Sequence, residues 1–320
     1  MILWGIEPPM NVVTLLPSAT EIVSTLGVEP VGVSHSCDYP PEVRDLPTLT
    51  YSRVDETADS ASIDKQVLEA ERAGGVYAID IEKLASADPD LIVTQGICDV
   101  CAVDTVLVRE AVEKRDLDCE ILTTDPHSLE DVFSDIERIG RAISRETRAA
   151  ELVSNLEKRV ERVRTNVPED PVERPRILDI DWMDPVMIGG HWVPELFGIA
   201  GGEYGIVGAG EASTPVEWEH VIEYDPETLV VAPCGFDLEQ TTANLDDLTG
   251  RAGWSNLTAV RESRVFIMDG SAYLNRPSSR LIDSLELVAS ALHPDRFDSP
   301  ETVATQPDAI RPFVVASSAD

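Results

Sequence analysis

The chain has 320 residues, enough for two domains of ordinary size that each bury a core. Its 59 acidic residues outnumber 25 lysines and arginines, and the net charge of −34 argues against a nucleic-acid partner. No stretch reaches the roughly 18–20 apolar residues of a membrane-spanning helix, so no membrane span is expected. Acidic residues occur along the whole chain, which favours a protein adapted to high salt, where screening shortens the range of self-repulsion.

The acidic composition predicts a salt-dependent fold. Lowering the KCl concentration from molar to millimolar is expected to lower the melting temperature, because repulsion among the 59 acidic side chains then acts over a longer range. A series of thermal melts followed by circular dichroism checks this prediction. A melting temperature that stays constant across the series would contradict adaptation to high salt.

The first ten residues predict where the protein resides. They contain Glu7, Pro8 and Pro9 and lack a basic segment, which is not the pattern of a signal peptide. This predicts a cytoplasmic location, or an extracytoplasmic one if the true start of the chain differs. The five cysteines are therefore expected in a reducing compartment, where a C-x-x-C pair indicates metal or redox chemistry rather than a structural disulfide.

Strand and helix patterns alternate along the first half of the chain. Strands are expected at 12–16, 31–34, 91–94 and 119–123, helices at 17–26, 63–73, 81–87 and 103–114, and a loop at 42–62. This alternation predicts an α/β fold with a mainly parallel sheet.

The second half is expected to repeat the pattern after a long helix. Helices are expected at 128–142 and 144–166, strands at 176–181, 229–232 and 265–268, and a last helix at 277–292. The helix at 144–166 is about 33 Å long, sufficient to bridge two lobes. Beyond Pro294 the tail is expected to be weakly ordered.

A repeated block suggests duplication. Asp88-Pro89 precedes the apolar run 91–94, and Asp225-Pro226 precedes the run 229–232, at an offset of 225 − 88 = 137. The predicted organisation is an N-terminal extension (1–11), an N-terminal α/β lobe (12–140), a linking helix (141–170), a C-terminal α/β lobe (171–297) and an acidic tail (298–320). Ligands of open α/β sheets bind at the carboxyl ends of strands, so residues that follow strands are candidate site residues.

Four cysteines follow predicted strands. Cys98 and Cys101 form a C-x-x-C pair after the strand at 91–94, Cys37 follows an earlier strand, and Cys234 follows the equivalent strand of the second half. Four thiolates would suit zinc or an iron–sulfur cluster. The alternative is that each is a small buried residue, as Cys119 is expected to be.

Two groups in the second half suit a ligand. The first follows strand 176–181 and combines aromatic with few polar side chains, as a flat macrocycle requires: Trp182, Asp184, His191 and Trp192. The second follows the last strand and suits an anionic group: Tyr273, Asn275, Arg276 and Arg280. The alternatives are core packing for the first group and offset of nearby acid for the second. His127, His220 and His293 are expected to have no chemical role, and no established catalytic motif is present.

The chain from about residue 12 to 297 resembles the solute-binding proteins of ABC importers for cobalamin, siderophores and haem. The resemblance rests on Leu16-Pro-Ser-Ala-Thr-Glu-Ile22, Asp88-Pro-Asp-Leu-Ile-Val93 and Arg280-Leu-Ile-Asp-Ser-Leu285. A cobalamin-binding-protein-like branch is indicated by His35-Ser-Cys-Asp-Tyr-Pro40, Cys98-Asp-Val-Cys-Ala-Val103, Trp192-Val-Pro-Glu-Leu196, Pro233-Cys-Gly-Phe236 and Asn275-Arg-Pro277.

This resemblance implies two Rossmann-like lobes joined by one long helix, with a corrinoid such as cobalamin, or a related metal chelate, bound between them. The implied ligand-binding residues are His35, Tyr39, Gln95, Trp182, Asp184, His191, Trp192, Phe236, Tyr273, Asn275, Arg276 and Arg280. Glu21 and Glu195 match positions that dock to arginines of an ABC permease, and both are expected to be exposed. The second hypothesis is an intracellular metalloprotein or enzyme with zinc or an iron–sulfur centre held by the four cysteines.

Overall fold

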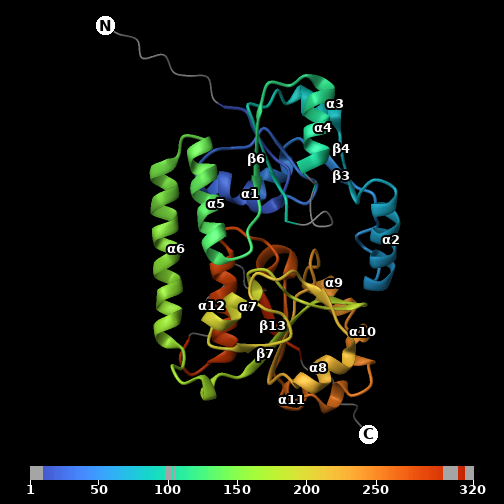
Figure 1. The fold of residues 1–320 in the computed structure, drawn as a ribbon, viewed down its shortest axis with the longest axis vertical. Coiled ribbons are helices and arrows are strands. Elements are labelled where there is room, and N and C mark those ends of the chain that lie inside the picture. Colours follow the sequence, from blue (N-terminus) through green and yellow to red (C-terminus); the bar gives the residue numbers. More distant parts are fainter. Residues whose placement is uncertain (1–9, 98–102, 104, 298–308, 314–320) are drawn as a thin grey trace. The chain divides into compact units, whose positions relative to one another are not determined.

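The structure is a computed structural model that describes residues 10–97, 103, 105–297 and 309–313 (Figure 1). Its internal contacts divide the chain into two compact units, each built from separate stretches of sequence. Unit 1 comprises Met1–Arg53, Gly74–Asp125 and Asp135–Ala150, and unit 2 comprises Val54–Ala73, Pro126–Ser134 and Glu151–Asp320. The predicted domain ranges, each a single contiguous stretch, stay predictions.

The described strands of unit 1 form a parallel sheet of order β2-β1-β5-β6 and a separate antiparallel pair, β3 and β4. Its elements are β1 (Val12–Thr14), α1 (Pro17–Thr25), β2 (Gly32–Val33), a 3-10 helix (Pro41–Asp45), β3 (Thr50–Ser52), β4 (Tyr77–Ile79), α3 (Ile81–Ser86), β5 (Leu91–Gln95), α4 (Thr105–Arg115) and β6 (Glu120–Thr124). The expectation of a loop at 42–62 is wrong, because this stretch holds a 3-10 helix, β3 and the start of a helix.

The core of unit 1 explains why its central strands lack charge. All five residues of β5 are buried, and β5 lies between β1 and β6 in the sheet. Ile92 packs in one apolar cluster with Val13 and Leu84, none of which is measurably exposed. A short, uninterrupted apolar run is the pattern of a strand covered on both faces.

Unit 2 holds a larger sheet of order β10-β8-β7-β11-β12-β13, with β9 paired to β7. Its elements are α2 (Ser60–Arg72), a 3-10 helix (Pro171–Glu173), β7 (Arg176–Met183), β8 (Val186–Ile188), α7 (Val193–Ile199), β9 (Glu203–Tyr204), β10 (Thr214–Pro215), α8 (Trp218–Tyr224), β11 (Thr228–Val231), α9 (Leu238–Ala243), α10 (Asp246–Thr249), a 3-10 helix (Trp254–Asn256), α11 (Thr258–Arg261), β12 (Val265–Met268), a π-helical turn (Gly270–Leu274), α12 (Leu281–Leu292) and β13 (Ile310–Pro312). Strands β7, β9, β11 and β12 are parallel.

Two helices contain residues assigned to both units: α5 (Leu129–Ala142) and α6 (Glu146–Asn166). The expectation of a weakly ordered tail is wrong at residues 309–313, because β13 pairs antiparallel with β12 and buries Ile310, while residues 298–308 and 314–320 lie outside the described residues. No helix within the described ranges is long and apolar enough to cross a membrane. The predicted α/β class is confirmed, and the sheet of order β2-β1-β5-β6 is parallel, as expected for the first half of the chain.

Helix α2 belongs to unit 2 although it lies in the first half of the sequence. Asp59 caps the helix by accepting a hydrogen bond from the backbone N–H of Ser62. Ile63 is buried in the main apolar cluster of unit 2. The backbone N–H of Ser60 donates to Asn244 at 3.2 Å, and its hydroxyl donates to the Asp247 carboxylate.

The repeated Asp-Pro block has the same backbone in both units. Asp88 and Asp225 both adopt left-handed backbone conformations, with φ of 45° and 47°. The strands that follow, β5 and β11, each pair in parallel with the first strand of their own unit. Gly27 and Gly201 likewise follow the first helix after those strands with φ of 80° and 86°. These matching conformations support the predicted duplication.

Candidate functional site

In unit 1 the candidate residues lie in the loop that follows β2. The Nδ1 of His35 lies 2.8 Å from the Thr50 hydroxyl, and the His35 backbone N–H donates to the same oxygen at 3.0 Å. The His35 ring also contacts the Tyr77 ring, with centroids 5.2 Å apart. These contacts fix the imidazole beside a cavity of about 10 Å³, which has room for about one water molecule.

Cys37 occupies a buried position close to His35. Its Sγ lies 3.0 Å from the Thr20 hydroxyl and 3.3 Å from the Ser34 hydroxyl, and its side chain packs against Val33 and Val43. Only 6% of the residue is exposed. This is the environment of a small core residue, the alternative considered above.

The predicted metal set contains three further cysteines. Cys98 and Cys101 lie outside the described residues. Cys234 is partly buried in unit 2, after β11. Within the described ranges no group of three or more His, Cys, Asp and Glu side chains could hold a metal ion. The four-cysteine centre therefore stays a prediction.

Unit 2 brings together two histidines that are distant in sequence. The Nδ1 atoms of His127 and His191 lie 3.2 Å apart, and the rings have centroids separated by 5.2 Å. For this hydrogen bond to form, one Nδ1 must be protonated and donate, and the other must be unprotonated and accept the hydrogen bond. The His191 ring also lies beside the Trp192 ring, at 5.8 Å. His127 was expected to have no chemical role, and only the tertiary structure places it next to a candidate ligand-binding residue.

Backbone geometry holds His191 in this position. Its φ of 52° is left-handed, which is uncommon for a residue other than glycine. Its backbone N–H donates to the carbonyl oxygen of Glu211 at 2.5 Å, and its own carbonyl accepts from Gly210 at 2.9 Å. The preceding Gly190 has no room for a side chain, because a Cβ there would lie 2.4 Å from the Glu211 oxygen. The close approach of these two loops therefore determines where the imidazole points.

The aromatic candidates of unit 2 divide into buried and half-buried side chains. Trp192 is 6% exposed and donates its indole N–H to the Leu274 carbonyl, and Phe236 is 2% exposed. Trp182 is half-buried at the carboxyl end of β7, with its ring 5.0 Å from Phe236. Asp184 accepts a hydrogen bond from Arg251 at 3.1 Å. Trp182 is thus the aromatic candidate with more surface left for a ligand.

The predicted anion-binding group lies mostly inside unit 2. Arg276 and Arg280 are 4% and 6% exposed. The guanidinium of Arg280 lies over the ring of Tyr273, 4.6 Å from its centroid. The Asn275 side chain donates to the Ala232 carbonyl at 2.8 Å. Burial of both arginines limits their access to a ligand, and the predicted role in anion binding stays a prediction.

Tyr39 and Gln95 belong to unit 1. Tyr39 is half-buried and precedes Pro40 through a cis peptide bond. Gln95 ends β5 with 6% of its surface exposed, and its carbonyl accepts a hydrogen bond from the Thr105 hydroxyl. The predicted role of these two side chains in ligand binding stays a prediction.

The expectation that both docking glutamates are exposed is wrong for Glu21. Only 1% of Glu21 is exposed, because residues 18–23 of α1 are all buried. Glu195 is half-buried, and its Oε2 accepts a hydrogen bond at 2.9 Å from the backbone N–H of Leu129, the first residue of α5. Glu195 therefore has a structural role as a cap, because a carboxylate is favourable at a helix N-terminus.

Two buried carboxyl groups on β7 were missed by the sequence analysis. Asp179 is not measurably exposed and Asp181 is 9% exposed. In the described part of the chain, neither oxygen of Asp179 nor Oδ1 of Asp181 has a hydrogen-bond partner. Burial, with a smaller contribution from Asp181, raises the pKa of Asp179 well above its usual value. Burial also raises the pKa of Asp181 to about 6, opposed by a hydrogen bond from Ser213. Aspartates within a strand that is otherwise apolar were the signal available in the sequence.

Parallel sheets in two α/β units, with aromatic and histidine side chains near strand ends, define a protein of the ligand-binding class. A family model described as periplasmic binding protein matches residues 12–272. This chain belongs to that family. The predicted resemblance to solute-binding proteins of the cobalamin, haem and siderophore type is therefore confirmed.

Individual relatives cover nearly the whole chain. A vitamin B12-binding protein of Vibrio cholerae is 26% identical over 296 residues, 89% of this chain and 90% of that protein. An ABC transporter substrate-binding lipoprotein of Bacillus subtilis is 24% identical over 91% of this chain and 82% of its own.

Solved structures show the same fold. The periplasmic vitamin B12 binding protein of Vibrio cholerae has a TM-score of 0.62 at 22% identity, over 93% of this chain and 99% of that one. A periplasmic haem-binding protein of Pseudomonas aeruginosa has a TM-score of 0.68 at 18% identity, over 92% and 96%.

These comparisons contradict the predicted cytoplasmic location. The two structural relatives are periplasmic proteins, and the relative from Bacillus subtilis is a lipoprotein. They point to an extracytoplasmic protein, and the prediction drawn from the first ten residues is wrong. The comparisons also give no support to the hypothesis of an intracellular enzyme or metalloprotein.

Proposed function

We propose that this chain is the solute-binding component of an ABC importer and that its ligand is a corrinoid such as cobalamin, or a related metal chelate. The observation that carries the proposal is the match to a vitamin B12-binding protein over 89% of this chain and 90% of that protein. A match of this extent includes both units rather than one shared segment. The proposed protein partner is the membrane permease of such an importer.

The chemistry of the candidate residues suits this class of ligand. A corrinoid is a broad macrocycle with a metal ion at its centre and polar amide groups at its rim. The half-buried ring of Trp182 offers an apolar surface for the macrocycle, and imidazoles such as His35 and His191 offer nitrogen atoms for polar contacts or metal ligation. Tyr77, beside His35, was not predicted from the sequence and joins the candidate residues of unit 1.

Cyanocobalamin is expected to bind with a dissociation constant of about 1 µM or lower, measured by isothermal titration calorimetry in molar KCl. The Trp182→Ala variant is expected to bind at least about tenfold more weakly, equivalent to the loss of about 1.4 kcal/mol of contact with the macrocycle. His220→Gln is the matched control, because His220 is exposed on α8. A melting curve of each variant verifies that it is folded.

Haem and a ferric hydroxamate siderophore form the other arms of the experiment. Tight binding of either one without binding of cyanocobalamin would contradict the corrinoid assignment while keeping the solute-binding class. Equal affinity of Trp182→Ala and the unmodified protein would remove Trp182 from the proposed site.

A further inference from the structure

Strand β6 is an edge strand of the unit 1 sheet. It pairs with β5, and the described residues include no strand on its other side. On the β5 side, the Glu120 N–H donates to the Asp90 carbonyl at 2.9 Å, and the Thr124 carbonyl accepts from Gly96 at 2.8 Å. Backbone groups of successive strand residues point to opposite sides, so Ile121 and Thr123 direct theirs to the open edge.

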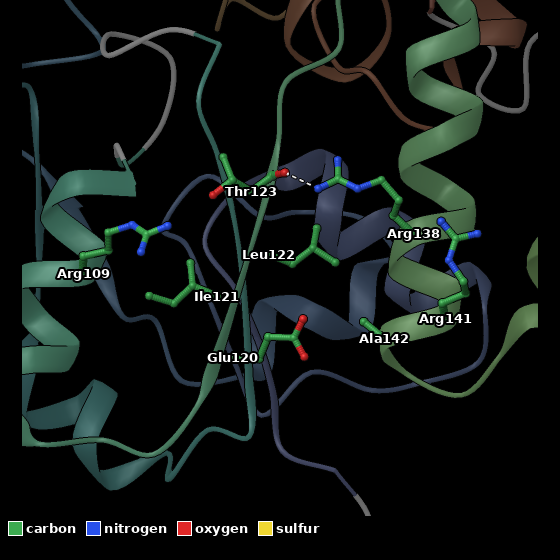
Figure 2. Close-up of a pocket in the computed structure, with 8 residues that line it drawn as sticks. All are labelled: Arg109, Glu120, Ile121, Leu122, Thr123, Arg138, Arg141 and Ala142. Carbon is green, nitrogen blue, oxygen red and sulfur yellow. Dashed lines mark hydrogen bonds between the residues drawn. The ribbon is translucent and has the colours of Figure 1, made fainter.

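Arginines surround this open edge. Figure 2 shows β6 between α4, which carries Arg109, and α5, which carries Arg138 and Arg141. These side chains and the residues of β6 line a cavity of about 600 Å³. Nη2 of Arg138 donates to the Thr123 carbonyl at 2.9 Å, while Nη1 lies 2.5 Å from Asp135. The Thr123 carbonyl is therefore occupied, whereas among the described residues the backbone N–H groups of Ile121 and Thr123 donate to no other backbone group.

The charge of this cavity is opposite to that of the whole protein. Its lining has three arginines and one glutamate, whereas the chain has 59 acidic residues against 25 lysines and arginines. Arg141 is 58% exposed and only loosely paired, with 3.8 Å to Glu137. Exposed strand edges are sites where another chain can pair, and proteins often protect them. Here the cations stand on both sides of the edge, where they would attract an acidic chain.

We propose that the open edge of β6 binds an extended acidic segment of a partner protein, which joins the unit 1 sheet as an additional strand. Backbone hydrogen bonds to Ile121 and Thr123 provide affinity, as in other cases of strand addition. Successive side chains of an added strand point to opposite faces of the sheet. Carboxylates on one face then reach Arg109 and those on the other face reach Arg141, so adjacent acidic residues are recognised together.

The test uses a fluorescein-labelled heptapeptide of glutamate and valine, with a pair of adjacent glutamates at its centre. Binding is followed by fluorescence anisotropy at the lowest KCl concentration that keeps the protein folded. A second peptide has one central glutamate replaced by glutamine. A third peptide has the same glutamine and, in addition, a neighbouring valine replaced by proline, which removes one backbone N–H from the ladder. The proline peptide is expected to bind at least tenfold more weakly than the glutamine peptide. Equal binding would overturn strand addition.

Variants of the protein test the role of the arginines. The double variant Arg109→Gln/Arg141→Gln is expected to bind the glutamate peptide at least fivefold more weakly. Arg145→Gln is the control, because Arg145 is exposed beyond the end of α5 and outside the cavity. The single variants Arg109→Gln and Arg141→Gln are measured as well. If Arg145→Gln lost as much affinity as each of them, the loss would be a general effect of charge and would overturn the proposal.

Hydrogen exchange identifies the contacting edge directly. Exchange of the Ile121 and Thr123 amide protons is expected to slow when the peptide binds, with amides of β2 unchanged. Unchanged exchange at both positions would place the peptide elsewhere. Sedimentation of the protein alone tests whether a second copy of this chain occupies the edge of β6. A dimer that the double variant abolishes would assign the edge to self-association and overturn the choice of a partner protein.

Discussion

The variant Arg159→Met is expected to lower the free energy of unfolding by about 3 kcal/mol. Nη2 of Arg159 on α6 lies 2.6 Å from the Asp283 carboxylate and 2.7 Å from the Glu286 carboxylate, both on α12. The two acidic side chains are only 8% and 9% exposed. Without the guanidinium their charges would be left with little solvation, and burial already raises the pKa of Asp283. Methionine keeps an unbranched apolar stem in the same space.

Urea denaturation at constant molar KCl measures this effect. The loss is expected at the lower end of the range for broken buried ion pairs, because Arg162 still contacts Glu286. Arg164→Met is the control, since Arg164 is exposed on the same helix and its replacement removes the same charge. Equal midpoints for the two variants would show that the ion pairs of Arg159 do not stabilise unit 2.

The second large effect is expected from the buried carboxyl groups of β7. Burial raises the pKa of Asp181 from 3.8 to about 6 and raises that of Asp179 well above 3.8. A carboxyl group whose pKa is higher in the folded than in the unfolded state favours folding when it is protonated. Its stabilising contribution is therefore complete only below the pKa of the unfolded state. This contribution is lost as the pH rises, between about 4 and 6 for Asp181 and as the pH passes through the raised pKa for Asp179.

Asp181→Asn is therefore expected to be more stable than the unmodified protein at pH 8. The shift from 3.8 to about 6 corresponds to about 3 kcal/mol at 1.36 kcal/mol per pKa unit. The two proteins should differ little near pH 4, where the carboxyl group is largely neutral in the folded state. Asp179→Asn is expected to act in the same direction. Urea denaturation at a series of pH values checks this, with exposed Asp295→Asn as the control; a difference that does not change with pH would contradict it.

Much of the fold was predictable because it depends on local sequence patterns. Apolar runs such as 91–94 and 229–232 form strands because only a buried position suits them, and both are found in the structure. The repeated Asp-Pro block was recognised from its residue types, and Asp88 and Asp225 adopt matching φ values because the conformation of such a block depends on local sequence. Short strands such as β3 and β9 were missed, because two or three residues carry too little periodicity to be distinguished from loop.

The candidate site was less predictable. The rule that ligands bind near strand ends identified His35, Trp182 and His191 as candidates. It did not identify the side chains that contact them. His127 lies 64 residues from His191, and no local pattern links the two rings. Tyr77 contacts His35 across 77 − 35 = 42 residues. Contacts of this kind depend on how distant elements pack, which the sequence pattern does not report.

The sequence by itself determined the class of fold and the family, because these depend on the order of strands, helices and turn residues. Only the tertiary structure decided exposure and pairing. It buried Glu21, which the resemblance to permease-docking positions had predicted to be exposed, and placed Cys37 among hydroxyl and apolar side chains. It also assigned α2 to unit 2, because Ile63 packs in the apolar cluster of that unit. The physical reason is that burial is a property of all the elements packed around a residue, whereas periodicity describes only the element on which it lies.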